Sequence, residues 1–222
     1  MSGAGEGIDR TMHYHKRDLW IEENTQFTRP HYRLEKVARI VNRIAQGRNS
    51  TLLDVGCGPA TLSRLVDSTI EYYGIDIAIQ EPAPNLLEAD LLERPIGFNG
   101  RKFDIVLAQG FFEYVGRFQS QKFGEIAGVL KRDGTVIVSY TNYAHRNRNV
   151  YWLHNNVQSI SEFRQGLSRH FKIRRSFPTS YNWAHCEPNR RLVKTVNMHL
   201  SGNLPILSPI FAVEYLFICS LP

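Results

Sequence analysis

The fold of this chain is decided by one stretch, residues 52–60, which reads LLDVGCGPA. The run from Thr51 to Val55 is short and apolar, as is typical of a buried strand. Glycines follow at positions 56 and 58, and apolar residues then recur at helical spacing between Ala60 and Val66. The stretch therefore predicts a strand, a tight glycine turn and a helix. Such glycines let the backbone approach a ligand, and the start of the helix offers free N–H groups.

The same alternation of strands and helices continues along most of the chain. Apolar runs bounded by turns predict strands at residues 51–55, 72–77, 86–89, 103–108, 135–140, 172–177 and 212–219. Apolar residues spaced three and four apart predict helices at residues 32–46, 60–66, 118–130 and 159–169. Strands that alternate with helices favour an α/β fold with a doubly wound, mostly parallel sheet. The length of 222 residues fits a single domain, 1–222.

Two aspartates stand where a nucleotide-like cofactor would be held. Asp54 lies two positions before the first glycine, where its carboxylate could hold an ammonium group or organise the loop. Asp76 ends the next strand 22 residues later, at the distance where an acid accepts both ribose hydroxyls. A nicotinamide dinucleotide would need a similar acid, but Thr61 replaces the last glycine of its fingerprint and the charge of Asp54 would repel a pyrophosphate. We therefore expect a cationic cofactor, S-adenosylmethionine (SAM). A purely structural role in the turn is the alternative for these residues.

Five segments in a fixed order resemble a known family. They are Asp54–Ala60, Gly74–Ile77, Glu88–Leu91, Phe103–Gly110 and Val129–Thr135. Between Tyr32 and Tyr140 the sequence thereby resembles class I SAM-dependent methyltransferases, although Ala60 replaces the commoner third glycine. The resemblance implies a Rossmann-like sheet of seven strands with an antiparallel last strand. It also implies that SAM is bound by Asp54, Gly56, Cys57, Gly58, Asp76, Ile77, Asp90, Leu91 and Gln109.

Two further segments are expected to cover the bound molecules. The chain is similar to small-molecule methyltransferases of the ubiquinone-pathway O-methyltransferase type, in which a segment like residues 1–31 closes over the cofactor as a lid. In such relatives an arginine can meet the cofactor carboxylate, and Arg33 is the candidate here. Residues 179–209 are too long for a plain hairpin between the last two strands. We interpret them as a substrate-cover insertion, with Tyr181 and Trp183 as acceptor-binding residues.

Candidates for the chemistry follow the fourth and fifth strands, because ligands bind at the carboxyl ends of the strands in such sheets. Glu113 and Tyr114 come after the fourth strand, and His145 and His154 come after the fifth. His145 and Glu113 are the candidate catalytic residues, while Tyr114 and His154 are expected to bind the acceptor. Methyl transfer is mainly a matter of alignment, so a base is needed only where the proton of the acceptor must leave early.

Composition and net charge limit the kinds of binding partner and acceptor that we expect for this chain. A formal charge of +6 and a pI near 9.3 would suit RNA or an anionic membrane surface, but the lysines and arginines are scattered rather than gathered in a tail. The three cysteines lie far apart, the chain begins without a signal peptide, and neither a metal-site spacing nor a spanning apolar stretch is present. We therefore expect a cytoplasmic enzyme without a metal, which methylates an oxygen or nitrogen of a small-molecule acceptor such as a sugar or biosynthetic intermediate. An RNA or protein methyltransferase and a catalytically silent SAM-binding partner are the alternatives, and a homodimer is left open.

Overall fold

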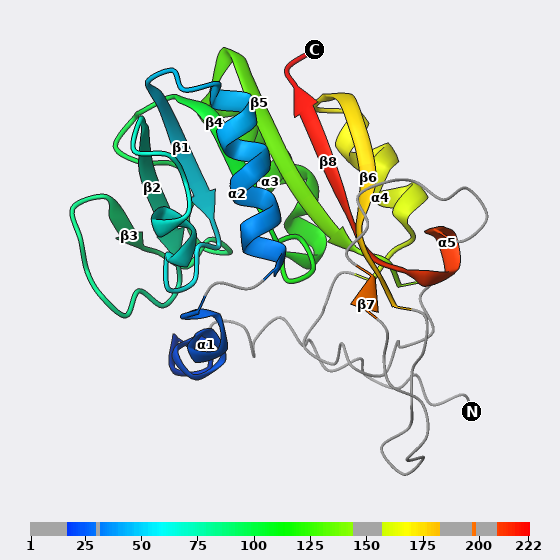
Figure 1. The fold of residues 1–222 in the computed structure, drawn as a ribbon, viewed down its shortest axis with the longest axis horizontal. Coiled ribbons are helices and arrows are strands. Elements are labelled where there is room, and N and C mark those ends of the chain that lie inside the picture. The colour runs from blue at the N-terminus through cyan, green and yellow to red at the C-terminus, as the bar shows by residue number, and fades with distance from the viewer. Residues whose placement is uncertain (1–16, 30–31, 144–156, 183–196, 199–207) are drawn as a thin grey trace, which may run out of the picture.

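The strands form one mixed sheet in the computed structural model of this chain, which describes residues 17–29, 32–143, 157–182, 197–198 and 208–222. The order of the strands is β3-β2-β1-β4-β5-β8-β6-β7 (Figure 1). Their bounds are β1 Ser50–Val55, β2 Ile70–Asp76, β3 Leu86–Glu88, β4 Phe103–Ala108, β5 Leu130–Thr141, β6 Lys172–Asn182, β7 Asn197–Met198 and β8 Ala212–Ser220. The first five strands pair in parallel, and β8 is antiparallel to both of its neighbours, β5 and β6. The predicted class, a mostly parallel sheet with an antiparallel last strand, is confirmed, and the two-residue β7 extends its edge.

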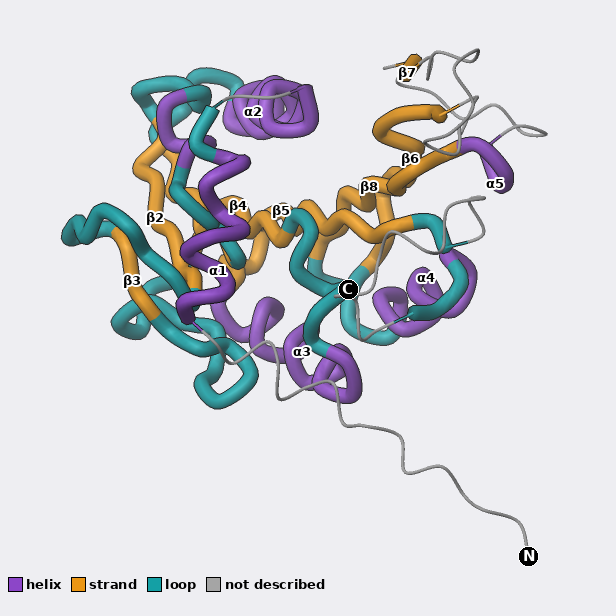
Figure 2. Tube along the Cα trace, turned by 90° about the horizontal axis from the view of Figure 1, so that it is seen from below, coloured by secondary structure: helices purple, strands orange, loops and turns teal. Residues whose placement is uncertain are grey.

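Helices cover both faces of this sheet (Figure 2). Helix α2 (Tyr32–Ala45) lies on one face, while α3 (Gln119–Val129) and α4 (Ile160–Ser168) lie on the other. Successive residues of a strand point to opposite faces, so Leu52 packs in the apolar cluster beneath α2 and Leu53 in the cluster beneath α3 and α4. Short helices α1 (Arg17–Asn24) and α5 (Ser208–Phe211) and the 3₁₀ turns η2 (Thr25–Phe27), η3 (Thr61–Arg64) and η4 (Gly116–Phe118) complete the described elements. None of these helices has the length and apolar character needed to cross a membrane.

The helix predicted over residues 60–66 is the main correction to the secondary structure. Only the 3₁₀ turn η3 forms there, closed by bonds of the short type such as Ser63 N–H to the Ala60 carbonyl at 3.0 Å. Two hydrogen bonds then fix Asp67 against Asn42 of α2. The Asp67 backbone N–H donates to the Asn42 side chain at 3.0 Å, and the Asn42 amide donates to the Asp67 carboxylate at 2.9 Å. This clamp turns the chain directly into β2. Two smaller differences are that β5 begins at Leu130 rather than at Thr135, and that α1 was not predicted.

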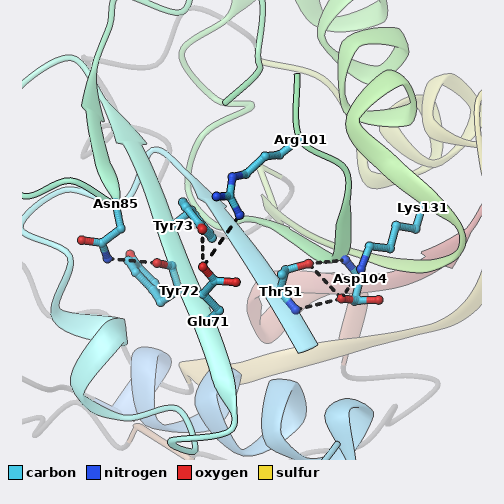
Figure 3. A network of polar contacts seen from close by, with 8 residues as sticks. All are labelled: Thr51, Glu71, Tyr72, Tyr73, Asn85, Arg101, Asp104 and Lys131. Carbon is cyan, nitrogen blue, oxygen red and sulfur yellow. Dashed lines mark hydrogen bonds and ion pairs between the residues drawn. The ribbon is translucent and has the colours of Figure 1, made fainter. Parts of the chain in front are cut away.

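A polar network joins the amino ends of β1, β4 and β5, and we call Thr51, Asp104 and Lys131 the amino-end network (Figure 3). The Asp104 carboxylate accepts hydrogen bonds from the backbone N–H and the hydroxyl of Thr51, both at 2.8 Å, and from Lys131 Nζ at 2.8 Å. The two charged side chains are 36% and 44% exposed. Although burial opposes ionisation, the bonds from Lys131 and Thr51 hold the pKa of Asp104 below its usual value. A second pair, Arg101 and Glu71 at 3.8 Å, lies at the start of β2.

Candidate functional site

The glycine turn after β1 has the backbone geometry of a ligand-binding loop. Gly56 and Gly58 have φ values of 74° and 53°, in the left-handed region that favours glycine. Ala60, which stands in place of the family's third glycine, also has φ 53°. The turn is folded back on the end of β2, because Gly56 N–H donates to the Ile75 carbonyl at 2.8 Å and Gly58 N–H donates to the Asp76 carboxylate at 2.8 Å.

Asp76 holds both this turn and the segment that follows β2. Its Oδ2 accepts the bond from Gly58, and its Oδ1 accepts a bond from Ala78 N–H at 2.9 Å. The residue is buried, at 8% exposure, and it lines a pocket at the carboxyl ends of the parallel strands. Asp76 therefore places a hydrogen-bond acceptor at the wall of the pocket.

This pocket gathers nearly all of the predicted cofactor-binding residues. Every one of them lines it except Asp54. The contributions come from the glycine turn, the end of β2, the segment after β3, the end of β4 and the start of α2. The two polar atoms of the Gln109 side-chain amide are buried and have no hydrogen-bond partner among the described residues. A buried amide without partners is costly, so Gln109 is suited to a polar ligand group.

Residues of the described N-terminal segment line this pocket. Helix α1 lies beyond the carboxyl end of β1 (Figure 1), and Trp20 and Phe27 line the pocket. The Trp20 ring meets the Tyr114 ring edge-on, with centroids 4.9 Å apart and an interplanar angle of 86°. Arg17 donates two hydrogen bonds to the Glu88 carboxylate, from Nε at 2.8 Å and from Nη2 at 3.1 Å. Residues of the described N-terminal segment therefore form part of the pocket wall, and the role of residues 1–31 as a lid stays a prediction.

Asp54 is the one predicted cofactor-binding residue that does not line the pocket. It is 5% exposed, and its carboxylate accepts a hydrogen bond from the Tyr72 hydroxyl at 2.8 Å. Burial raises the pKa of Asp54 to about 7, against the Tyr72 hydrogen bond and with a further contribution from the charge of Asp76. The strand directs Asp54 toward Tyr72 of β2, and both of its expected roles, holding the cofactor and organising the loop, stay predictions.

Cys57 lies in the pocket wall but is chemically protected. A Cβ atom at Gly74 would lie 2.7 Å from the Cys57 sulfur, so the thiol fits only because position 74 carries no side chain. Burial, with the nearby charges of Asp54 and Asp76, raises the pKa of the Cys57 thiol well above its usual value. A thiol that stays protonated is a poor nucleophile, so Cys57 serves packing.

Glu113, a predicted catalytic residue, is buried beside the pocket. It is 1% exposed, and its Oε1 accepts hydrogen bonds from the backbone N–H of Thr141 at 2.8 Å and from the Thr141 hydroxyl at 2.9 Å. Its Oε2 is buried and has no hydrogen-bond partner among the described residues. Burial and the charge of Glu214 raise the pKa of Glu113 to about 7, although Thr141 and Arg33 oppose the shift. Glu113 does not itself line the pocket, whereas Phe111 and Tyr114 on either side of it do.

Glu214 is a second buried carboxylate at this place, and sequence reasoning missed it. It lies on β8, where it pairs with Thr141 of β5 and with Ser180 of β6. Its Oε1 accepts a hydrogen bond from Arg33 Nη2, and its Oε2 accepts one from the Thr179 hydroxyl at 2.8 Å. The available signal was a lone acid inside the apolar run of residues 212–219. We call Arg33, Glu113, Thr141, Thr179 and Glu214 the carboxyl-end cluster.

The other predicted residues divide into three groups. Tyr114 lines the pocket. Tyr181 is fully buried, does not line the pocket, and pairs its hydroxyl with Ser208 Oγ at 2.8 Å. Its position on β6 beside Ala212 of β8 places it within the sheet, and its role in binding the acceptor stays a prediction. His145, His154 and Trp183 lie outside the described residues. Among the described residues, no three His, Cys, Asp or Glu side chains are grouped to hold a metal ion.

Comparisons with known proteins agree with this geometry. A family described as a methyltransferase domain matches residues 30–186, which is more than half of the chain. The fold is similar to a SAM-dependent methyltransferase from Clostridium acetobutylicum, with a TM-score of 0.59 and 13% identity over 86% of this chain and 92% of that one. It is also similar to a SAM-dependent methyltransferase from Aquifex aeolicus, with a TM-score of 0.59 and 15% identity over 91% of this chain and 98% of that one. No curated protein matches the chain by sequence. The fold is therefore the Rossmann-like fold of these SAM-dependent methyltransferases, and the chain belongs to the methyltransferase-domain family.

Proposed function

We propose that this enzyme methylates an oxygen or nitrogen of a small-molecule acceptor, such as a sugar or a biosynthetic intermediate. The observation that carries the proposal is the aromatic lining of the pocket by Trp20 of α1 and Phe27 of η2. A concave pocket with aromatic walls favours a small ligand, whereas a polymer needs an open groove. An RNA or protein acceptor is the rival outcome of the experiment below.

The residues of the pocket fit SAM, which supplies an electrophilic methyl group when it is bound. Asp76 is the candidate acceptor for the ribose hydroxyls, and Asp90, which also lines the pocket, is the candidate partner of the adenine amino group. The partnerless amide of Gln109 and the guanidinium of Arg33 are the candidate donors for the amino-acid part of the cofactor. Within the glycine turn, Gly56 and Gly58 keep the backbone free of side chains where the cofactor would approach.

Methylation of an O–H or N–H group releases one proton, and we propose that Glu113 accepts it. Because Glu113 lies behind the pocket wall, the proton would pass through a bridging water to Oε2, the oxygen that lacks a partner among the described residues. A carboxyl group whose pKa is raised by burial to about 7 is matched to proton transfer near neutral pH. His145 remains the alternative base. Residues 1–31 as a lid and 179–209 as a substrate cover, within one domain, complete the proposal.

Labelled SAM identifies the class of acceptor. The full chain is incubated with methyl-labelled SAM and, separately, with the small-molecule, RNA and protein fractions of an extract from the producing organism. We expect label in the small-molecule fraction, and a loss of roughly a hundredfold in rate for Glu113→Gln, because general-base catalysis contributes about that much. Label confined to RNA or protein overturns the small-molecule acceptor. Full activity of Glu113→Gln, with a loss in His145→Ala, moves the base to His145.

Calorimetry with S-adenosylhomocysteine, the demethylated cofactor, tests the binding residues without an acceptor. Replacement of Asp76 by Ala is expected to weaken binding by about a hundredfold, since charged hydrogen bonds to two hydroxyls would be lost. Asp133→Ala is the matched control, because Asp133 is an exposed aspartate outside the pocket. Equal affinity in the wild type and Asp76→Ala would remove Asp76 from the ribose site.

A further inference from the structure

Glu214 is too well supplied with donors to be a passive core residue. Three donors from three elements reach its carboxylate: Arg33 of α2, Ser139 of β5 and Thr179 of β6. Ser139 in turn accepts a hydrogen bond from Gly110 N–H at 2.9 Å, next to the pocket wall. The Glu214 side chain is only 4% exposed. Burial alone would favour its neutral form, but the charge of Arg33 and the hydrogen bonds outweigh it and keep the pKa of Glu214 below its usual value.

Glu113 also lies near the charge of Arg33, but it accepts hydrogen bonds from fewer elements than Glu214 does. Its charged and titratable neighbours are Arg33 of α2, Glu214 of β8 and Tyr140 of β5, among the described residues. The two hydrogen bonds that it accepts from Thr141 both go to Oε1. Two carboxylates beside one guanidinium cannot both be ionised cheaply. The carboxylate with more donors keeps the charge, and the other takes up a proton.

Arg33 connects this pair of carboxylates with the pocket. Its side chain is 32% exposed and lines the pocket, and a Cβ atom at Gly110 would lie 3.7 Å from its Nη2. The bond to Glu214 fixes the guanidinium in this position. Although burial opposes the charge of Arg33, the Glu214 carboxylate raises the pKa of the guanidinium above its usual value, so it stays charged.

We propose that Glu214 is a positioning residue, which fixes the Arg33 guanidinium at the pocket wall and leaves Glu113 as the carboxyl group that accepts the acceptor's proton. In the reaction, the methyl group would leave the sulfonium of SAM, which becomes S-adenosylhomocysteine, and would bond to the acceptor's oxygen or nitrogen. The acceptor's O–H or N–H bond breaks, and the proton passes through a bridging water to Oε2 of Glu113 behind the pocket wall. This inference rests on the proposed role of Glu113. Glu214 touches neither reactant and acts through Arg33 and Glu113.

Carboxyl-carbon NMR of the full chain, labelled at the glutamate side chains, tests the proposal without an acceptor. Glu113→Gln and Glu214→Gln assign the two signals. In the wild type we expect Glu113 to titrate near neutral pH and Glu214 to stay ionised well below it. In Glu214→Gln the titration midpoint of Glu113 should fall by about one pH unit or more, because a like charge has been removed and Arg33 now serves Glu113 alone.

Matched variants separate positioning from packing. Glu214→Asp retains the charge and should keep the Glu113 midpoint close to the wild-type value, and Asp104→Asn, which removes a carboxylate with similar partners at the far end of the strands, should leave it unchanged. Glu214→Gln should also weaken S-adenosylhomocysteine binding by roughly tenfold, because Arg33 loses its anchor. An unmoved midpoint in folded Glu214→Gln overturns the proposal. So does a wild-type protein in which Glu214 titrates near neutrality, a result that needs no Glu214 variant to fold.

The proposed function fails by a different measurement. If Glu113→Gln transfers methyl groups at the wild-type rate, Glu113 is not the base, whatever the NMR midpoints show. If Glu113→Gln is slow but Glu214→Gln leaves the Glu113 midpoint in place, the base stands and the role of Glu214 is refuted.

Discussion

The amino-end network and the carboxyl-end cluster are built from the same kinds of side chain at opposite ends of one sheet. Each has an acid that accepts a hydrogen bond from a threonine hydroxyl and one from a long cationic side chain: Asp104 with Thr51 and Lys131, and Glu214 with Thr179 and Arg33. They differ in exposure, because the Asp104 side chain is 36% exposed and the Glu214 side chain is 4% exposed. They also differ in the second buried carboxyl, Glu113, which only the carboxyl-end cluster contains.

This difference shows that the same combination of acid, threonine hydroxyl and cation has different effects in exposed and in buried surroundings. At the amino ends, water can replace any lost partner, so the network contributes little and its acid is held ionised. At the carboxyl ends, water is excluded and one cation must serve two acids, so one of them becomes a proton acceptor near neutral pH. A structural contact and a candidate reactive group thus differ by burial and by one added charge.

The largest effect should follow from removing the cation of the buried cluster. Arg33→Met leaves the ionised Glu214 in a water-poor site without its counter-charge, and we expect a loss of about 3–5 kcal/mol in the free energy of unfolding. Urea denaturation at neutral pH, followed by circular dichroism, measures it. A loss below about 1 kcal/mol would mean that the cluster behaves like a surface pair, and the comparison would break.

Glu113→Gln should change how stability depends on pH. Because the pKa of Glu113 is raised from 4.5 to about 7 in the folded chain, the folded state holds a proton that the unfolded state has released between these values. Its contribution is therefore fully present below pH 4.5 and lost as the pH rises through about 7. The variant lacks this loss, so relative to the wild type it should gain about 2–3 kcal/mol between pH 4.5 and pH 8. Parallel pH slopes of unfolding free energy in the two proteins would contradict the assignment.

A matched pair of threonine variants should sharpen the comparison. Thr141→Val removes one of the two donors to buried Glu113 and should cost about 1–2 kcal/mol, because no water replaces it. Thr51→Val removes a donor to half-exposed Asp104 and should cost less than half as much. Thermal unfolding of the two variants at one pH compares them directly. Equal losses would show that exposure does not separate the two ends.

The smallest effect is expected for Lys131→Met. The pair it forms with Asp104 is half-exposed, so its loss should cost no more than about 1 kcal/mol. Because the pKa of Asp104 is lowered, the contribution should exist at neutral pH and disappear as the pH falls through the range of this carboxyl. High salt should also erase it. A difference between wild type and variant that persists in 1 M salt would place this pair with the buried cluster.

The parts of the site that a local sequence pattern marks could be predicted. The contacts that form between distant strands of the sheet could not. The glycine turn, Asp76 and Gln109 follow strand ends at recognisable spacings, and all line the pocket. Glu214 meets Arg33 only because β8 inserts between β5 and β6, and no local pattern records that pairing. Tyr181 was expected to bind the acceptor because of its residue type, and sequence spacing did not record that its side chain is buried in the sheet.

Local geometry explains the remaining errors in the fold. The apolar spacing after Ala60 is helical, but three left-handed residues close together and the clamp between Asn42 and Asp67 leave room only for a 3₁₀ turn. Helix α1 has only a weak apolar pattern, and its place is set by contacts with distant residues such as Glu88 and Tyr114. Spacing therefore predicts the type of an element better than its length or its docking.

The insertion of β8 has a consequence for the order in which the chain folds. Strand β8 follows β6 in the chain but lies between β5 and β6, and it provides hydrogen-bond partners to both. Until it is in place, the edge of β5 stands open and β6 has no route into the sheet. Pairings between segments far apart in sequence form slowly, because loop closure must precede the gain from the contact. A chain that has folded only its parallel half would already possess the glycine turn, but it would lack the carboxylate that anchors Arg33.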